Sequence, residues 1–398
     1  MDLFDKCKAF TKPNEYREKG TYPYFHCLES RQAKEVVMEG KRRIMLGSNN
    51  YLGLTTCKDV VEAAEKALAK YGTGCSGSRF MNGTLDLHVE LERELADFLG
   101  MEDAITFPTG FQTNLGIISS MVGRNDYVIC DRENHASIYD GCRLSYGTML
   151  RYHHSDMDEL ERMLRKVPAT SGCLIVTDGV FSMKGDICKL PEIVSLARRY
   201  GARIMVDDSH ALGVIGKGGR GTASHFGLEG EVDIIMGTFS KSFASLGGFM
   251  AGNRIAVDYA RHTSRPFIFS ASMPPANTAS ALAALRHLKS QPDIVERLKS
   301  IADYTRASFR SHSIEIVDSP TPIIPIMTRT VDYTLELAKN LYDNGVYVNP
   351  VLPPGVPEGE CLLRVSLMAT VTEDLVDEAA GIIAEEIRKL GHGTNEVS

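Results

Sequence analysis

The chain has 398 residues, a length that suits two or three domains or one large domain with a smaller one attached. Hydrophobic residues make up 43% of it and charged residues 24%, as in an ordinary globular enzyme. The net charge of -7 and the lack of any basic arm in the sequence exclude a general nucleic-acid-binding protein. Nine cysteines form no C-x-x-C pair, and no apolar run marks a signal peptide or a membrane-spanning helix. We therefore expect a cytoplasmic protein with reduced thiols.

The first 45 residues are mixed and polar, and they predict an N-terminal arm. Residues 47–53, G-S-N-N-Y-L-G, predict a turn, and residues 59–71 predict an amphipathic helix. That helix runs into G-T-G-C-S-G at residues 72–77, a literal G-x-G-x-x-G. A dinucleotide fingerprint needs a strand before its glycines and a helix directly after them. A helix precedes them here, so a flexible loop beside a ligand is favoured over a nicotinamide-dependent oxidoreductase.

From residue 86 onward, helical and strand patterns alternate. The pattern predicts helices at 86–99, 110–121, 156–166 and 190–200, and strands at 104–107, 127–130, 173–177, 203–206 and 232–236. Continuous apolar strands separated by helices predict an α/β domain with a mostly parallel sheet covered on both faces. We assign residues 46–275 to this large ligand-binding domain.

Past F-S-A-S-M-P-P at residues 269–275 the pattern changes. A helix-rich stretch is predicted at 277–309, helices at 331–343 and 373–390, and strands at 314–317, 323–327, 347–348 and 362–367. This pattern predicts a smaller C-terminal α+β domain over 276–398. The double proline at Pro274 and Pro275 is the expected hinge between the two domains.

Polar side chains follow the predicted strands at their carboxyl ends, where open α/β sheets bind ligands. Residues 109–111, T-G-F, open a helix whose free N–H groups suit a phosphate. His135 by itself is more often a hydrogen-bonded loop histidine. D-D-S-H at residues 207–210 by itself could bind a metal, but no second group has metal-ligand spacing, so no metal site is expected. Together the strand ends carry a phosphate cradle, two histidines, an aspartate and a lysine: Gly110, Phe111, His135, Ser182, Asp207, His210, Thr238, Ser240 and Lys241.

Lys241 follows a buried strand and stands among hydroxyls and small residues. Burial of an ammonium lowers its pKa, which supplies the neutral amine that a Schiff-base lysine needs. For a lone lysine the ordinary alternative is a side chain that reaches back to solvent. Arg364 lies in an apolar strand, where an arginine usually has a carboxylate partner. That partner could equally be an internal acid or a ligand.

Taken together, these motifs resemble the α-oxoamine synthases, a family of fold-type I enzymes that use pyridoxal 5'-phosphate (PLP). Segments in the family's order span nearly the whole chain: N-N-Y-L-G at 49–53, T-G-F at 109–111, N-H-A-S at 134–137, D-G-V-F-S at 178–182, D-D-S-H at 207–210, T-F-S-K-S-F-A-S-L-G at 238–247 and R-V-S-L-M-A-T at 364–370. Within the family, residues 22–25, 71–79 and 82–88 are most similar to the soluble bacterial serine palmitoyltransferases.

The resemblance implies that Lys241 holds the cofactor covalently and later removes the substrate Cα proton. It implies that His135 stacks on the cofactor ring and that Asp207 keeps the ring nitrogen protonated. It further implies that His210 and Ser182 contact the ring hydroxyl, and that Arg364 binds the substrate carboxylate while Asn50 lies near the substrate. The phosphate would be held by Gly110, Phe111, Thr238 and Ser240.

The resemblance also implies a homodimer with shared sites, in which Ser270 or Ser272 reaches the phosphate of the other chain. Two positions depart from the family: Ala271 stands where relatives often have threonine, and Val371 where they often have histidine.

The implied reaction condenses L-serine with a long-chain acyl-CoA (palmitoyl-CoA) and releases CoA and CO2. The product is 3-ketosphinganine, made in the first step of sphingolipid synthesis. Three alternatives remain open: 2-amino-3-ketobutyrate CoA ligase, 8-amino-7-oxononanoate synthase and a catalytically silent partner subunit. Acyl-chain length and peripheral membrane contact are also open.

Overall fold

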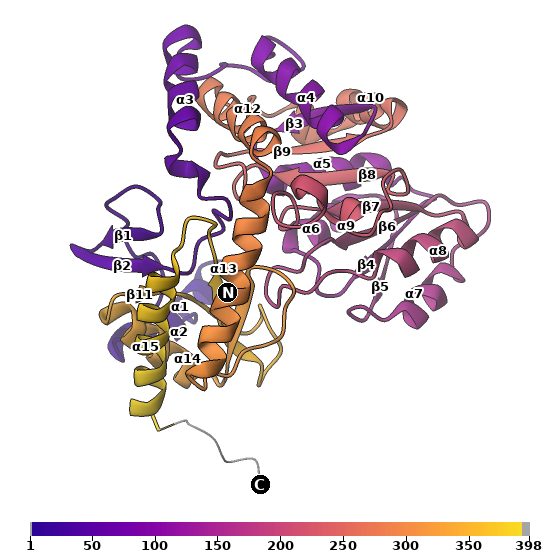
Figure 1. The fold of residues 1–398 in the computed structure, drawn as a ribbon. Helices are drawn as coiled ribbons and strands as arrows, with labels where there is room; N and C mark the ends of the chain where they lie inside the picture. The colour runs from indigo at the N-terminus through magenta and orange to yellow at the C-terminus, as the bar shows by residue number, and fades with distance from the viewer. Residues whose placement is uncertain (1, 392–398) are drawn as a thin grey trace.

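The computed structural model describes residues 2–391, and a seven-stranded sheet forms its centre (Figure 1). The strand order is β3-β9-β8-β7-β6-β4-β5. β4 to β8 pair in parallel, and β9 runs antiparallel to both of its neighbours. The strands are β3 (Asp103–Phe107), β4 (Tyr127–Asp131), β5 (Thr148–Tyr152), β6 (Cys173–Asp178), β7 (Arg203–Asp207), β8 (Ile234–Thr238) and β9 (Gly248–Gly252).

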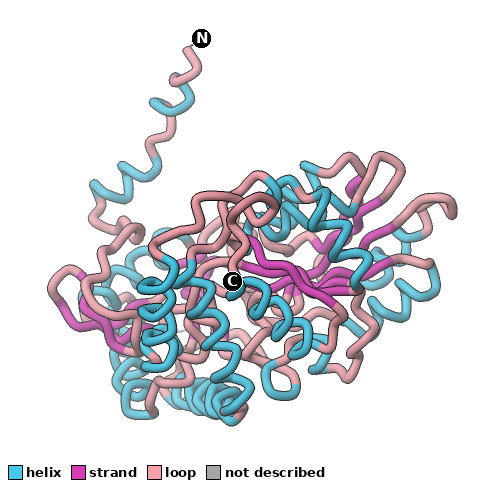
Figure 2. The backbone as a smooth tube through the Cα atoms, turned by 90° about the horizontal axis from the view of Figure 1, so that it is seen from above, coloured by secondary structure: helices cyan, strands magenta, loops and turns pink. Residues whose placement is uncertain are grey.

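Both faces of this sheet are buried, because successive residues of each strand enter two different hydrophobic cores. Val128 and Ile129 of β4, for example, point into opposite cores. One face is covered by α5 (Gly110–Met121), α6 (Ala136–Leu144), α10 (Arg254–Thr263) and α11 (Arg265–Ile268). The other face is covered by α4 (Asp86–Leu99), α7 (Met157–Leu164) and α8 (Leu190–Tyr200). Seen from above, the strands run between the helices, which confirms the predicted α/β architecture (Figure 2).

Two strands of the seven-stranded sheet were not predicted, and their sequences explain why. β9, G-F-M-A-G, has glycine at both ends, and glycine weakens the strand pattern. β5 lies at the sheet edge and is only partly buried, so it lacks the continuous apolar run of the central strands.

The C-terminal part has a three-stranded antiparallel sheet, ordered β10-β13-β12, with long helices around it. The predicted helix-rich stretch 277–309 consists of two helices that are separated near Pro292. The predicted strand 314–317 is reduced to one bridge between Ile316 and Ile326. The elements are α12 (Pro275–Ser290), α13 (Asp293–Ser311), β10 (Ile323–Arg329), α14 (Val331–Asp343), β11 (Val346–Tyr347), β12 (Asn349–Val351), β13 (Cys361–Ser366) and α15 (Glu373–Lys389).

The N-terminal segment is more than an arm. After the short helices α1 (Asp5–Lys8) and α2 (Lys12–Glu18), the hairpin of β1 (Glu35–Met38) and β2 (Lys41–Met45) pairs in parallel with β11. The proposed N-terminal arm, residues 1–45, and the proposed small domain, residues 276–398, thus share a sheet through β2 and β11. The division at 45 and 275 stays a proposal, and residues 392–398 of the proposed small domain lie outside the described residues.

Four short or connecting helices complete the chain: η1 (Leu54–Thr56), α3 (Lys58–Tyr71), η2 (Lys217–Gly219) and α9 (Thr222–His225). α3 packs along α12 on one side of the large sheet (Figure 1). Across residues 2–391, every helix is too short or too polar to span a bilayer.

Candidate active site

The carboxyl ends of the parallel strands surround a cavity of about 220 Å³. Asp178 at the end of β6 and Asp207 at the end of β7 are register partners, so the loops after them start side by side. The topology thereby gathers side chains that are up to 131 positions apart in the chain. Nine of the predicted residues line the cavity: Gly110, Phe111, His135, Ser182, Asp207, His210, Thr238, Ser240 and Lys241.

Lys241 enters this cavity from the loop after β8. Burial lowers the pKa of its amine from 10.5 to about 8, although the negative charges of Asp207 and Asp178 act in the opposite direction. A substantial fraction of the amine is therefore neutral near physiological pH, as a nucleophilic lysine requires.

Asp207 is buried, and two hydrogen bonds orient its carboxylate. Its Oδ2 accepts from Asn114 Nδ2 at 2.7 Å, and its Oδ1 accepts from the backbone N–H of Ser209 at 3.0 Å. The same Asn114 amide donates to Ser137 Oγ at 2.9 Å. Each carboxylate oxygen retains a free lone pair, so the group can still accept a proton-bearing ring nitrogen.

His135 lies at the N-cap of α6, and its side chain lines the cavity. Its Nδ1 accepts from the backbone N–H of Ser137 at 3.3 Å and lies 2.7 Å from Ser137 Oγ. These contacts fix the ring plane, and burial lowers its pKa, so the ring is neutral. A neutral, oriented ring is suited to stacking on a planar ligand.

His210 is connected to Arg364 through Tyr51. Arg364 Nη2 donates to the Tyr51 hydroxyl at 3.2 Å, and that hydroxyl lies 2.7 Å from His210 Nδ1. Since arginine only donates, the phenol proton is available for Nδ1, which leaves the His210 proton on Nε2. Burial and the nearby positive charges of Lys241 and Arg364 hold the His210 pKa well below 6.5, so this ring is also neutral.

Arg364 is 5% exposed, and no carboxylate pairs with it anywhere in residues 2–391. It donates to neutral groups: Ser182 O at 2.5 Å, Asn49 Oδ1 at 3.0 Å, Ser366 Oγ at 2.5 Å and Tyr51 Oη at 3.2 Å. An internal acidic partner, the alternative left open by the sequence, is therefore absent from the described chain. A buried guanidinium without a counter-charge is costly unless a ligand supplies one.

The N-terminus of α5 also lines the 220 Å³ cavity. Thr109 caps this helix by accepting from the backbone N–H of Gln112 at 3.1 Å. A Cβ on Gly110 would come within 2.7 Å of Thr238 Oγ1. Only glycine at position 110 therefore allows the start of α5 and the end of β8 to approach each other this closely. The free N–H groups, the helix dipole and the hydroxyls of Thr238 and Ser240 make a site for an anion.

Three predicted residues lie elsewhere. Asn50 does not line the cavity, because its amide donates to Thr55 Oγ1 at 2.6 Å, whereas the neighbouring Asn49 faces Arg364. Ser272 Oγ is bonded to the carbonyls of Gly77 and Gly83 at 3.0 and 2.6 Å. Ser270 accepts from Gln112 Nε2 at 3.1 Å, outside the cavity.

Sequence reasoning did not single out Asn49, Tyr51 or Asn114. The first two belong to the N-N-Y-L-G segment, whose letters do not reveal which side chains face inward. Asn114 is one polar residue on the buried side of α5, and a buried amide in an apolar helix is a signal that could have been used. Val371, the other family departure, is buried in the hydrophobic core at 6% exposure.

A wider groove of about 940 Å³ opens beside the same residues. Lys241, His135 and Arg364 form its floor, and the N-terminal segment together with residues 349–354 forms its walls. The apolar and aromatic side chains that line the groove include Phe10, Tyr16, Tyr24, Met183, Val331, Val351 and Leu352.

Comparison with known proteins agrees with this geometry. The model of the family "Aminotransferase class I and II" matches residues 41–383. A serine palmitoyltransferase of Sphingobacterium spiritivorum is 52% identical over 95% of this chain and 94% of that protein. An 8-amino-7-oxononanoate synthase of Bacillus subtilis is 42% identical over 95% of this chain and 96% of that protein.

Solved structures also match this chain over nearly its whole length. A serine palmitoyltransferase from S. paucimobilis, solved with a bound PLP–myriocin aldimine, superposes with a TM-score of 0.94 at 37% identity, covering 98% of this chain and 100% of that chain. The chain therefore belongs to the aminotransferase class I and II family and, within it, to the fold-type I α-oxoamine synthases, where it is more similar to the serine palmitoyltransferase than to the 8-amino-7-oxononanoate synthase.

Proposed function

We propose that this protein uses pyridoxal 5'-phosphate to condense L-serine with a long-chain acyl-CoA, of the length of palmitoyl-CoA, to give 3-ketosphinganine, CoA and CO2. The observation that carries the proposal is the buried Arg364, which has no counter-charge in the described chain and lies in one groove with Lys241. An amino-acid carboxylate bound there would supply the missing charge and place the amino acid next to the lysine amine.

The cavity fits the proposed cofactor at both of its ends. The α5 N-terminus, Thr238 and Ser240 would hold the phosphate, Asp207 the ring nitrogen and Lys241 the aldehyde carbon. Bound pyridoxal phosphate would supply an electron sink for the negative charge that develops at the substrate Cα. Asp207 sustains that capacity, because its negative charge stabilises a proton on the ring nitrogen.

The roles of the other residues follow from their orientation. His135 would cover one face of the ring, and neutral His210 would donate its Nε2 proton to the ring hydroxyl. Arg364 holds the carboxylate with its planar fork, which fixes the direction of the bonds at Cα. Lys241 Nζ, neutral above about pH 8, is then positioned to take the Cα proton.

The wide groove supports a long acyl chain as the second substrate. Its walls are apolar and aromatic, and the groove leads directly to Lys241. A palmitoyl tail against such walls gains ~0.8 kcal/mol for each methylene group removed from water. A chain-length series from acetyl- to palmitoyl-CoA should therefore show kcat/KM that increases with length. A decrease with length would contradict the assignment.

Amino-acid and acyl-CoA choice are tested together. Release of free CoA thiol is measured with serine, glycine and alanine, each combined with palmitoyl-, acetyl- and pimeloyl-CoA. The highest kcat/KM for serine with palmitoyl-CoA supports the proposal. A highest value for glycine with acetyl-CoA identifies a 2-amino-3-ketobutyrate CoA ligase, and one for alanine with pimeloyl-CoA identifies an 8-amino-7-oxononanoate synthase.

A catalytically silent subunit is tested separately. Borohydride reduction of the purified holoenzyme followed by peptide mapping should label Lys241. A protein that takes up the cofactor without labelling at Lys241 and releases no CoA would be a silent subunit.

We also propose a homodimer in which Ser270 reaches the partner's phosphate site. Ser272 is the weaker candidate, because its hydroxyl is already committed to carbonyls of its own chain. Light scattering would give the molar mass, and Ser270→Ala should weaken cofactor binding whereas Ser272→Ala should mainly lower stability.

The nine free cysteines are consistent with the proposed cytoplasmic location. We also propose peripheral membrane contact through the exposed Leu3, Phe4 and Phe10, which adjoin several lysines. Co-sedimentation with anionic vesicles, compared between the protein and a Leu3→Asp, Phe4→Asp variant, tests this contact.

A further inference from the structure

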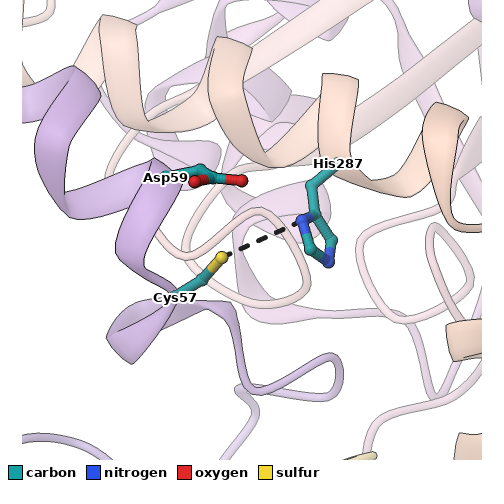
Figure 3. Close-up of side chains that lie close together, drawn as sticks. All are labelled: Cys57, Asp59 and His287. Atoms are coloured by element: carbon teal, nitrogen blue, oxygen red, sulfur yellow. Dashed lines mark hydrogen bonds between the residues drawn. The ribbon is translucent and has the colours of Figure 1, made fainter.

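A second group of potential ligands lies where the start of α3 meets the end of α12 (Figure 3). Cys57 immediately precedes α3, Asp59 lies in its first turn, and His287 lies in the last turn of α12. One ligand atom from each side chain lies within 4.8 Å of the other two. None of the three residues lines the active-site cavity or groove.

The three side chains point toward one another and are not engaged elsewhere. Figure 3 shows the Cys57 thiol facing the imidazole, with Sγ and Nδ1 separated by 3.9 Å. Cys57 is at the N-cap position, yet its side chain makes no capping hydrogen bond. Within residues 2–391, the Asp59 carboxylate has no ion pair or hydrogen bond, and the His287 ring bonds only to Cys57.

Basic side chains around the group do not prevent a cation from binding. Lys58 pairs with Glu62 at 3.5 Å, and Arg286 pairs with Glu94 at 2.6 Å. Their charges are therefore compensated locally. Asp59 is exposed and the other two residues are half-buried, so an ion can enter from solvent.

We propose that Cys57, Asp59 and His287 bind a zinc ion, with water as the fourth ligand. Tetrahedral zinc with a Zn–S bond of ~2.3 Å and a Zn–N bond of ~2.05 Å places sulfur and nitrogen about 3.6 Å apart. The observed separation of 3.9 Å needs to shorten by only a few tenths of an ångström. A thiolate, an imidazole and a carboxylate together favour zinc over magnesium or calcium, which prefer oxygen ligands.

The ion would join two helices that are distant in sequence but packed together. Cys57 also ends the segment that carries Asn49 and Tyr51, the residues in contact with Arg364. Zinc at this site would therefore brace that segment as well as the helix pair and raise the unfolding temperature of the protein.

The test uses the chelator-treated holoenzyme and zinc or cobalt alone. Equilibrium dialysis should show one zinc per chain, and Cys57→Ser and His287→Gln should each weaken binding at least about tenfold. Cys27→Ser removes an exposed cysteine that is not part of the group and is the matched control, with affinity unchanged. Bound cobalt should give tetrahedral d–d bands at the red end of the visible spectrum, away from the absorption of the cofactor.

The unfolding temperature provides a second measurement. Zinc should raise it in the wild type and in Cys27→Ser but not in Cys57→Ser, while the metal-free proteins unfold at similar temperatures. Zinc binding that is equal in the wild type and in both ligand variants would overturn the proposal, as would the absence of any saturable site in the wild type.

Discussion

Replacing Arg364 by lysine tests the assignment of the substrate carboxylate. The guanidinium is 5% exposed and makes hydrogen bonds only to neutral groups, so its positive charge is available to a ligand. Lysine keeps the charge but donates from a single atom, and it cannot reproduce the two parallel bonds of the arginine fork. The variant therefore isolates the geometry of recognition from its charge.

The size of the effect follows from the bond that is lost. A hydrogen bond to a charged group contributes ~1.5–3 kcal/mol, which corresponds to a decrease of about 10–150-fold in kcat/KM for serine. The KM for acyl-CoA should change little, because the tail is proposed to lie against the apolar walls of the groove and not against Arg364.

The assay is CoA release with serine varied at saturating palmitoyl-CoA. Borohydride-trapped cofactor measures loading of each variant. Arg42→Lys is the matched control, since Arg42 is an exposed arginine that pairs with Glu35 and Glu378 and does not line the groove. An Arg364→Lys enzyme that is fully loaded and whose kcat/KM for serine matches that of the control would refute the reasoning.

Three further predictions concern the cofactor site. Asp207→Asn should retain covalently bound cofactor but lower kcat about 10²–10³-fold, because a neutral amide does not stabilise the ring proton; a kcat close to wild type would contradict the role of the carboxylate. In the apoenzyme, the rate constant for cofactor uptake should rise with pH and level off above about pH 8, since burial holds the Lys241 pKa near 8 and only the neutral amine reacts. The negative charge of Asp207 raises the Lys241 pKa, so removal of that charge in Asp207→Asn should move the midpoint of the profile to lower pH. A wild-type rate constant that still increases near pH 10.5 would exclude the lowered pKa. Gly110→Ala introduces a Cβ 2.7 Å from Thr238 Oγ1. Overpacking costs ~1–3 kcal/mol, which predicts roughly 5–150-fold weaker cofactor binding. Equilibrium dialysis of the apoenzyme would measure the affinity, and an unchanged affinity would show that the loop can relax.

Many residues that line the cavity could be predicted, because the alternation of apolar strands and helices in the sequence already indicates a parallel sheet. Apolar runs separated by helices imply crossover connections, and crossovers place the carboxyl ends of the strands at one edge. Polar residues directly after those runs, such as His135, Asp207 and Lys241, must then converge. The lowered pKa expected for Lys241 also followed from its position after a buried strand, and the structure agrees.

Other features depended on contacts that no local pattern records. Asn49 and Asn50 are adjacent in one turn, and only the backbone path decides that Asn49 meets Arg364 while Asn50 bonds to Thr55. The antiparallel insertion of β9 between β8 and β3 depends on how the chain returns through the loop 239–247, which carries Lys241.

The amino-acid sequence alone determined the family, the mostly parallel sheet and the position of Lys241 after a buried strand, because each of these depends on residues close together in the chain or on their periodicity. Only the tertiary structure decided that Arg364 has no acidic partner in the described chain and that His287 faces Cys57, 230 positions away. The direction of a side chain depends on the packing of whole elements, and the energy of that packing is summed over contacts between segments remote in sequence.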